Sequence, residues 1–142
     1  MDWAYLFNSF EGRITRQAFW IAMIAVTAAN MLGCFAAQEI AGDRLSAIVD
    51  LAFTYPEFAV GAKRSHDRNL PLWLLAAFFV ANAALDFLTV LGWAGTTDQP
   101  STPALVIAVP FTVFGLALLV ELGIRRGTKG PNPYGPDPLA KG

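Results

Sequence analysis

Four long apolar stretches determine what this chain of 142 residues can fold into. A helix needs about 20 mostly apolar residues to cross the hydrocarbon core of a bilayer. The composition agrees, because 55% of the residues are hydrophobic, whereas about 45–50% is usual for a soluble domain. We therefore predict an all-α polytopic membrane protein, with four transmembrane helices in a single membrane domain over residues 1–142. The predicted spans cover about residues 17–38, 45–62, 71–91 and 103–124.

The lysines and arginines give this topology a direction. If the N- and C-termini are both cytoplasmic, only Arg44 of the ten basic residues lies outside. Cytoplasmic loops hold the excess of Lys and Arg, because the insertion machinery and the anionic inner leaflet retain cations. We therefore place both termini in the cytoplasm. The cytoplasmic cations are then Arg13 and Arg16 before the first span, Lys63, Arg64 and Arg68 in the middle loop, and Arg125, Arg126, Lys129 and Lys141 after the last span.

The second stretch is the least apolar of the four. It contains Asp50 and Glu57, and an acidic residue at mid-membrane costs about 2.5–3.5 kcal/mol on insertion scales. Without this span, however, either the middle basic cluster or the basic tail would lie outside. Four spans therefore fit the charges better than three.

The two ends of the chain carry different patterns. Within residues 2–10, Trp3, Leu6, Phe7 and Phe10 share one helical face, which predicts a short helix at the membrane interface. The alternative is an irregular aromatic segment. Residues 125–142 are rich in glycine and proline, so we expect an extended or turn-rich cytoplasmic tail.

Three polar residues within the predicted spans are expected at similar depths. At about 1.5 Å per residue, Asp50 and Asp86 lie roughly 7–8 Å below the outer boundary, and Asn30 lies slightly deeper. We expect a polar layer in which Asn30 binds one or both aspartates. Its functional interpretation is a proton or cation relay. The alternative is that the aspartates reach water separately or pair with Arg44.

Glu57 lies in the inner half of the second span. Arg64 is seven residues further on and on the same helical face, and Arg13 or Arg16 are also candidates to reach it. We therefore expect a structural ion pair at Glu57 in preference to a catalytic role.

The segment from Arg64 to Arg68 is the densest ionisable cluster of the sequence. His66 titrates near neutral pH, and Asp67 is placed to orient its ring. With the neighbouring cations, this loop is suited to bind a lipid phosphate or another anion. There is one histidine in the chain, which excludes a histidine-rich metal site, and we expect neither a metal nor a cofactor. Nothing beyond ordinary loop charge indicates nucleic-acid binding.

Three segments together resemble the bacterial membrane family called domain of unknown function 805. They are the run from Phe10 to Trp20 with Gly12, Arg13 and Arg16, the run from Pro56 to Trp73 with Arg64, His66 and Asp67, and the run from Gly127 to Pro138 with Asn132, Tyr134 and Gly135. Ser65 and Pro133 depart from the residues usual in the family.

The resemblance implies a multi-pass protein of the bacterial inner membrane, and it implies no reaction. It directs attention to Arg13, Arg16, His66, Asp67, Asn132 and Tyr134. Since all three segments face the cytoplasm in the predicted topology, we expect them to fold together into one inner cap. The alternative is that each is a separate turn or a positively charged anchor.

The functional expectation follows from these features. We expect a non-enzymatic scaffold or accessory subunit whose basic cap binds anionic lipid, a membrane protein partner or a second copy of the chain. The second candidate is a small transporter or ion-conducting oligomer that uses Asp50 and Asp86. The third and weakest is an interfacial enzyme that acts on lipid head groups through His66 and Asp67.

Overall fold

The fold is all-α, as the sequence predicts. We use a computed structural model, which describes residues 2–95 and 99–140. Lys141, one of the predicted cytoplasmic cations, lies outside the described residues. The helices within the described residues are α1 (Trp3–Asn8), α2 (Arg16–Ala41), α3 (Asp43–Asp67), α4 (Leu72–Val90), α5 (Thr102–Leu118) and a π-helical turn, η1 (Leu119–Ile124), that continues α5.

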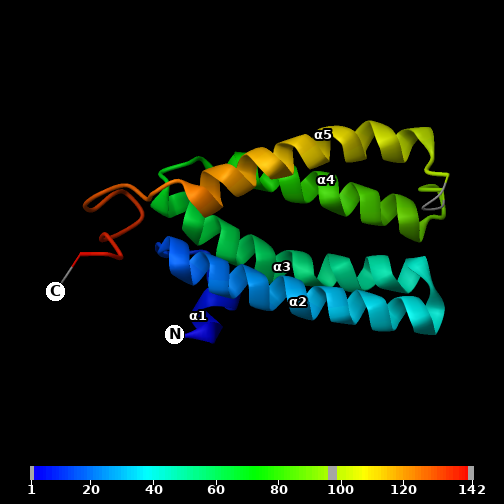
Figure 1. Ribbon diagram of the computed structural model, residues 1–142, viewed down its shortest axis with the longest axis horizontal. Coiled ribbons are helices and arrows are strands. Elements are labelled where there is room, and N and C mark those ends of the chain that lie inside the picture. Colours follow the sequence, from blue (N-terminus) through cyan, green and yellow to red (C-terminus); the bar gives the residue numbers. More distant parts are fainter. Residues whose placement is uncertain (1, 96–98, 141–142) are drawn as a thin grey trace.

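The four long helices run along the long axis of the molecule, and each reverses the direction of the one before it (Figure 1). Helix α3 packs against both α2 and α4, while α5 packs against α4. The start of α2, the end of α3, the start of α4 and the end of η1 lie together with both terminal segments. We call this the cap end, and the opposite end the far end.

Three helices within the described residues are long and apolar enough to cross a membrane: Arg16–Ala41, Leu72–Val90 and Thr102–Ile124. Helix α3 has 25 residues and is also long enough. It does not meet the same criterion of apolarity, because charged residues occur along its whole length, from Asp43 to Asp67.

Side-chain exposure agrees with a membrane protein. Leu32 on α2, Val80 on α4 and Val113 on α5 are 71%, 68% and 66% exposed. The end of α3 shows the opposite, since Lys63 and Arg64 are at most 1% exposed. A water-soluble protein seldom buries such charges completely while large apolar side chains cover its surface.

The cap end differs from the prediction in two ways. The basic segment Lys63–Asp67 forms the last turns of α3 and not a loop, so that only four residues, 68–71, connect α3 to α4. Helix α1 covers six residues and ends at Asn8, because Ser9 takes an extended conformation. Asp2 caps α1 by accepting from the Tyr5 amide, and Thr15 caps α2 by accepting from the Ala18 amide.

Candidate functional site

A buried triad of charges forms the centre of the cap. The Asp67 carboxylate accepts from Arg13 through Oδ1, at 2.9 Å from Nη2, and from Arg64 through Oδ2. The three side chains are at most 4% exposed. One carboxylate between two guanidiniums leaves a net positive charge, and buried charges of this kind need further hydrogen bonds.

Arg13 obtains those hydrogen bonds from the C-terminal tail. Its Nη1 donates to the carbonyl of Gly130 at 2.8 Å, and its Nη2 donates to the carbonyl of Thr128 at 2.7 Å. A weaker bond reaches the carbonyl of Gly135 at 3.3 Å. The planar fork of arginine makes several such bonds at once. Arg13 therefore ties the tail to the segment before α2.

The tail also binds the end of α3 directly. The Thr128 amide donates to the Asp67 carbonyl at 2.8 Å, and the Asn132 side-chain amide donates to the His66 carbonyl at 2.9 Å. These bonds hold the tail against the last turn of α3, where the His66 carbonyl also accepts from the Asn69 amide at 3.0 Å. Gly127 is required for the close approach, because an added Cβ would lie 2.0 Å from Asp67 Oδ2.

His66 is stacked on Tyr134 and fixed in one tautomer. The two ring centroids are 3.9 Å apart and the planes differ by 7°. His66 Nδ1 lies 3.1 Å from the Gly12 carbonyl oxygen, and since a carbonyl only accepts, Nδ1 carries the proton. Burial lowers the pKa of His66; the bond to Gly12 opposes this shift and the charge of Lys63 adds to it. Nε2 is buried and has no hydrogen-bond partner among the described residues.

His66 and Asp67 do not form the pair that the sequence suggests. The Asp67 carboxylate faces the two arginines, while the His66 ring faces Gly12 and Tyr134. The physical reason is the helix, in which consecutive side chains point about 100° apart. The expectation that Asp67 orients the His66 ring was therefore wrong.

Lys63 holds the N-terminal segment against α3. Its ammonium donates to the carbonyl of Ser9 and lies 5.2 Å from the centroid of the Tyr5 ring. Burial lowers the pKa of Lys63 to about 8. The Tyr5 hydroxyl in turn donates to the Glu11 carbonyl at 3.0 Å. Lys63 was predicted only as a loop cation, and no pattern in the sequence indicates these contacts.

A run of backbone carbonyls at the end of η1 is bound by side chains from other helices. Trp20 donates to Gly123 at 2.9 Å and Arg16 donates to Ile124 at 2.9 Å. Without Gly123 this contact would be blocked, since an added Cβ would lie 2.6 Å from the Trp20 ring. The last carbonyls of a helix have no intrahelical donor. The remaining carbonyls of the run are those of Leu122 and Arg125, bound by Arg64, and that of Arg126, bound by Arg68.

The structure thus joins most of the predicted cap residues. Arg16 binds the carbonyl of Ile124 at the end of η1, and not the Asp67 carboxylate or the tail. The family motifs supplied this set, but Trp20 and Thr128 were missed as contributors. Their role depends on backbone carbonyls far away in the sequence, and a sequence pattern carries no signal for such contacts.

Glu57 does not form the predicted ion pair. Its carboxylate accepts from the Asn30 amide at 3.4 Å, and no ion pair of Glu57 occurs among the described residues. Two helical turns separate Glu57 from Arg64, about 10 Å along the axis. Arg64 points to Asp67 and η1 at the cap end instead.

A second polar cluster lies toward the far end. Asn30 on α2 donates to Asp50 on α3 at 2.6 Å. The amide nitrogen of Asn82 on α4 lies 3.1 Å from Asp50 and 2.9 Å from Asp86. The expected polar layer is therefore present, with Asn82 as a member that was missed. Its position four residues before Asp86, on the same face of α4, was the signal.

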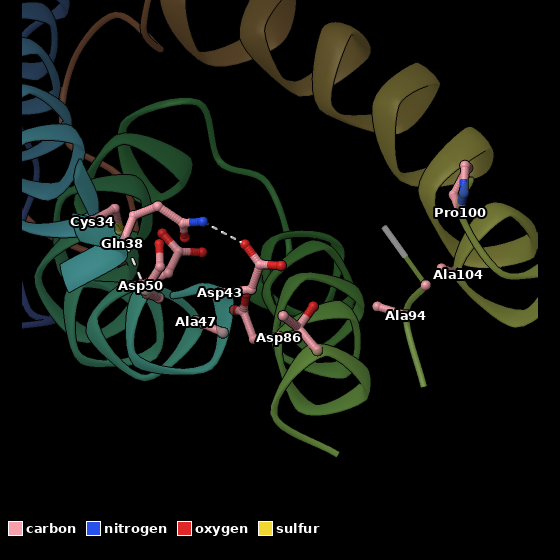
Figure 2. A pocket seen from close by; sticks show the side chains of 12 residues that line it. Cys34, Gln38, Asp43, Ala47, Asp50, Asp86, Ala94, Pro100 and Ala104 are labelled. Carbon is pink, nitrogen blue, oxygen red and sulfur yellow. Dashed lines mark hydrogen bonds between the residues drawn. The ribbon is translucent and has the colours of Figure 1, made fainter. Parts of the chain in front are cut away.

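Asp50 and Asp86 also line an open pocket of about 380 Å³ at the far end. Figure 2 shows Cys34, Gln38, Asp43 and Asp50 on one side of it, Ala94, Pro100 and Ala104 on the other, and Asp86 between them in this view. All four long helices, α2 to α5, contribute residues to the wall. Among the described residues, no group of three or more His, Cys, Asp or Glu side chains is arranged to hold a metal ion.

Comparison with known proteins decides the family. The model of a family described as "Protein of unknown function (DUF805)" matches residues 7–136. The chain belongs to the DUF805 family. This confirms the resemblance seen in the three motifs, and the matched range includes the cap residues from Arg13 to Tyr134.

Two relatives are similar over most of their length. Both are called "Uncharacterized protein YiiR", one from Escherichia coli (strain K12) and one from Escherichia coli O157:H7. Each is 34% identical over 140 residues, which cover 91% of this chain and 85% of the relative. No solved structure matches the chain.

Proposed function

We propose that this DUF805 protein is a non-enzymatic scaffold or accessory subunit of the bacterial inner membrane. Its cytoplasmic cap binds anionic lipid or a membrane protein partner. The observation that carries the proposal is the buried Arg13–Asp67–Arg64 triad. In it, the ionisable groups of the family motifs bind one another and the backbone, and they join the N-terminal segment, α3 and the tail into one surface.

The proposal includes four membrane spans with both termini in the cytoplasm. Helix α3 is the span that its composition does not favour. Its intramembrane carboxylates, Asp50 and Glu57, bind the Asn30 and Asn82 amides of the neighbouring helices. Polar residues within membrane proteins face other helices in this way and not the lipid. The distribution of Lys and Arg then supports a cytoplasmic cap end.

The topology is tested with reporter fusions. A cytoplasm-active reporter placed after Arg68 and one placed after Pro138 are both expected to be active, and a fusion in the loop before Ser101 is expected to be inactive. Activity of a periplasm-specific reporter after Arg68 would contradict the four-span arrangement.

The binding function is tested by affinity purification in mild detergent, with lipids and proteins identified together. The His66→Ala variant removes the stack on Tyr134 and is expected to lose a lipid or partner that the wild type retains. Thr112→Ala, an exposed change in α5, is the matched control. If neither lipid nor protein is enriched over an unrelated four-span membrane protein, the proposal is wrong.

The second candidate is a small transporter or ion-conducting oligomer. The observation that favours it is the Asn82 amide shared by Asp50 and Asp86, on the wall of the far-end pocket. Carboxylates that face each other in such a site are suited to exchange a proton or a cation. Flux in proteoliposomes that vanishes in the Asp86→Asn variant would support this candidate, and retained flux would exclude a relay through Asp86.

A further inference from the structure

A basic pocket of about 460 Å³ lies at the cap end, between the start of α2 and the tail. Its wall includes the exposed cations Arg16, Arg126 and Lys129, and the hydroxyl-bearing residues Thr15 and Thr128. Arg64, which is buried in the cap, also lines the pocket. The pocket borders the contacts that hold the cap together, since Arg64, Asp67 and Thr128 also line it.

Two carboxylates on the same wall are already bound. Asp67 lies between Arg13 and Arg64, as described above. Asp137 accepts from the amides of Gly130 and Leu139, each at 2.9 Å. Four cations against two carboxylates leave an excess of positive charge around the pocket.

The exposed cations are available to a ligand. The side chains of Arg126 and Lys129 make no hydrogen bond or ion pair within residues 2–95 and 99–140. Arg16 uses Nη1 to bind the Ile124 carbonyl, and its other donors are not engaged by that bond. Three cationic side chains thus line one opening, and none of them has an ion-pair partner among the described residues.

The first turn of α2 adds a favourable field. Helix α2 has 26 residues, and its N-terminus carries partial positive charge and backbone N–H groups without intrahelical acceptors. Arg16 and Gln17 of this turn line the pocket. An anion with several acceptor oxygens is suited to these donors, and phosphate is the biological group of that kind.

The position of the pocket indicates where such a phosphate comes from. Helix α2 begins at Arg16, and the α5–η1 helix ends at Ile124. Both are helices long and apolar enough to cross a membrane, so their ends mark the boundary of the hydrocarbon core. Lipid head-group phosphates lie at this boundary.

We propose that this pocket binds a phosphate group, supplied by the head group of an anionic lipid of the cytoplasmic leaflet. The inference deepens the proposed function and rests on it for the side of the membrane. The phosphate oxygens are bound by Arg126, Lys129 and Arg16. The backbone N–H groups in the first turn of α2 orient the phosphate. Arg64 and Asp67 of the triad line the same pocket, but their charged groups are already bound within the triad, so we assign the phosphate to the three exposed cations.

The test uses the full chain with paired changes in the exposed cations. The R126A/K129A double variant removes two charges without touching the triad, and Arg44→Ala removes an exposed cation at the far end as a matched control. Retention of phosphatidylglycerol and of phosphatidylcholine is measured by native mass spectrometry from mixed micelles. We expect phosphatidylglycerol to bind the wild type and the control, and to bind the double variant about tenfold or more weakly, since each surface cation contributes about fivefold.

A second arm distinguishes the source of the phosphate. Binding of inorganic phosphate is measured by calorimetry in neutral detergent. One outcome is that inorganic phosphate binds the wild type but not the double variant, while neither protein retains phosphatidylglycerol selectively. That result would support a phosphate site but would assign it to a soluble ligand. Equal phosphatidylglycerol retention by the double variant and the Arg44→Ala control, with no phosphate binding, overturns the inference. If a lipid or protein still co-purifies with the double variant in a His66-dependent way, the proposed function stands while this site is wrong.

Discussion

Arg13 and Asp67 lie 54 residues apart in the sequence, and their side chains form a buried ion pair with 2.9 Å between Nη2 and Oδ1. The pair joins the segment before α2 to the last turn of α3. Arg64 binds the second oxygen of the same carboxylate. Because Arg13 also binds the tail carbonyls, one carboxylate organises three distant parts of the chain.

The Asp67→Asn variant is expected to unfold at a markedly lower temperature than the wild type. It leaves two buried guanidiniums without a negative partner, which costs roughly 3–5 kcal/mol when a buried pair is broken. Thermal unfolding followed by tryptophan fluorescence in detergent measures the loss. Glu11→Gln removes an exposed carboxylate of the same region and is the control. Equal melting of the two variants would show that the triad is not a stabilising element.

The Gly127→Ala variant is expected to release the tail from the cap. The new methyl group would overlap the Asp67 carboxylate, so that the chain must move away from α3. Limited proteolysis after residue 127 measures this release as faster cleavage. Gly130→Asn is the control, because Gly130 has a φ of +75° and open space around it, and asparagine tolerates that conformation. Equal protection of the tail in both variants would contradict the close packing.

The stability of the cap is expected to fall in mild acid because of His66. The pKa of His66 in the folded protein lies below its ordinary value of 6.5, so the unfolded chain binds the proton more readily. Stability is therefore complete above about pH 6.5 and decreases as the pH falls from there through the lowered pKa. Melting temperatures between pH 5 and 8 measure this slope.

The His66→Phe variant isolates that contribution. Phenylalanine preserves a ring against Tyr134 and does not titrate, while other acid-sensitive groups remain. The difference in melting temperature between the wild type and this variant is expected to change as the pH falls below about 6.5. Parallel pH profiles for the two proteins would exclude His66 as the source.

The Asn82→Ala variant is expected to weaken contacts between α3 and α4. It removes the amide to which Asp50 and Asp86 are both bound. These half-buried carboxylates then lose a partner, which costs about 1–3 kcal/mol where water does not replace it. Thermal unfolding compared with Thr112→Ala measures the effect. An unchanged melting temperature would mean that water replaces the amide at this site.

The residue pattern was sufficient for the all-α class, the approximate helix positions and the family. Apolar stretches of the required length and a family motif that preserves its order carry that information locally. Asp50, Asp86 and Asn30 were also placed in one layer from helix rise alone. The predicted ion pair of Glu57 was wrong, because two side chains that share a helical face can still lie far apart along the axis.

The tertiary structure alone decided which groups bind one another at the cap. Sequence spacing suggested a His66–Asp67 pair, but the helix turns the two side chains apart, and Asp67 binds Arg13 from a segment more than fifty residues away. The contacts of Trp20, Arg16 and Arg64 with the carbonyls of η1 depend on how the ends of three helices meet. A backbone carbonyl is present at every residue, so only the fold determines which carbonyls lack a helical donor and which side chains reach them.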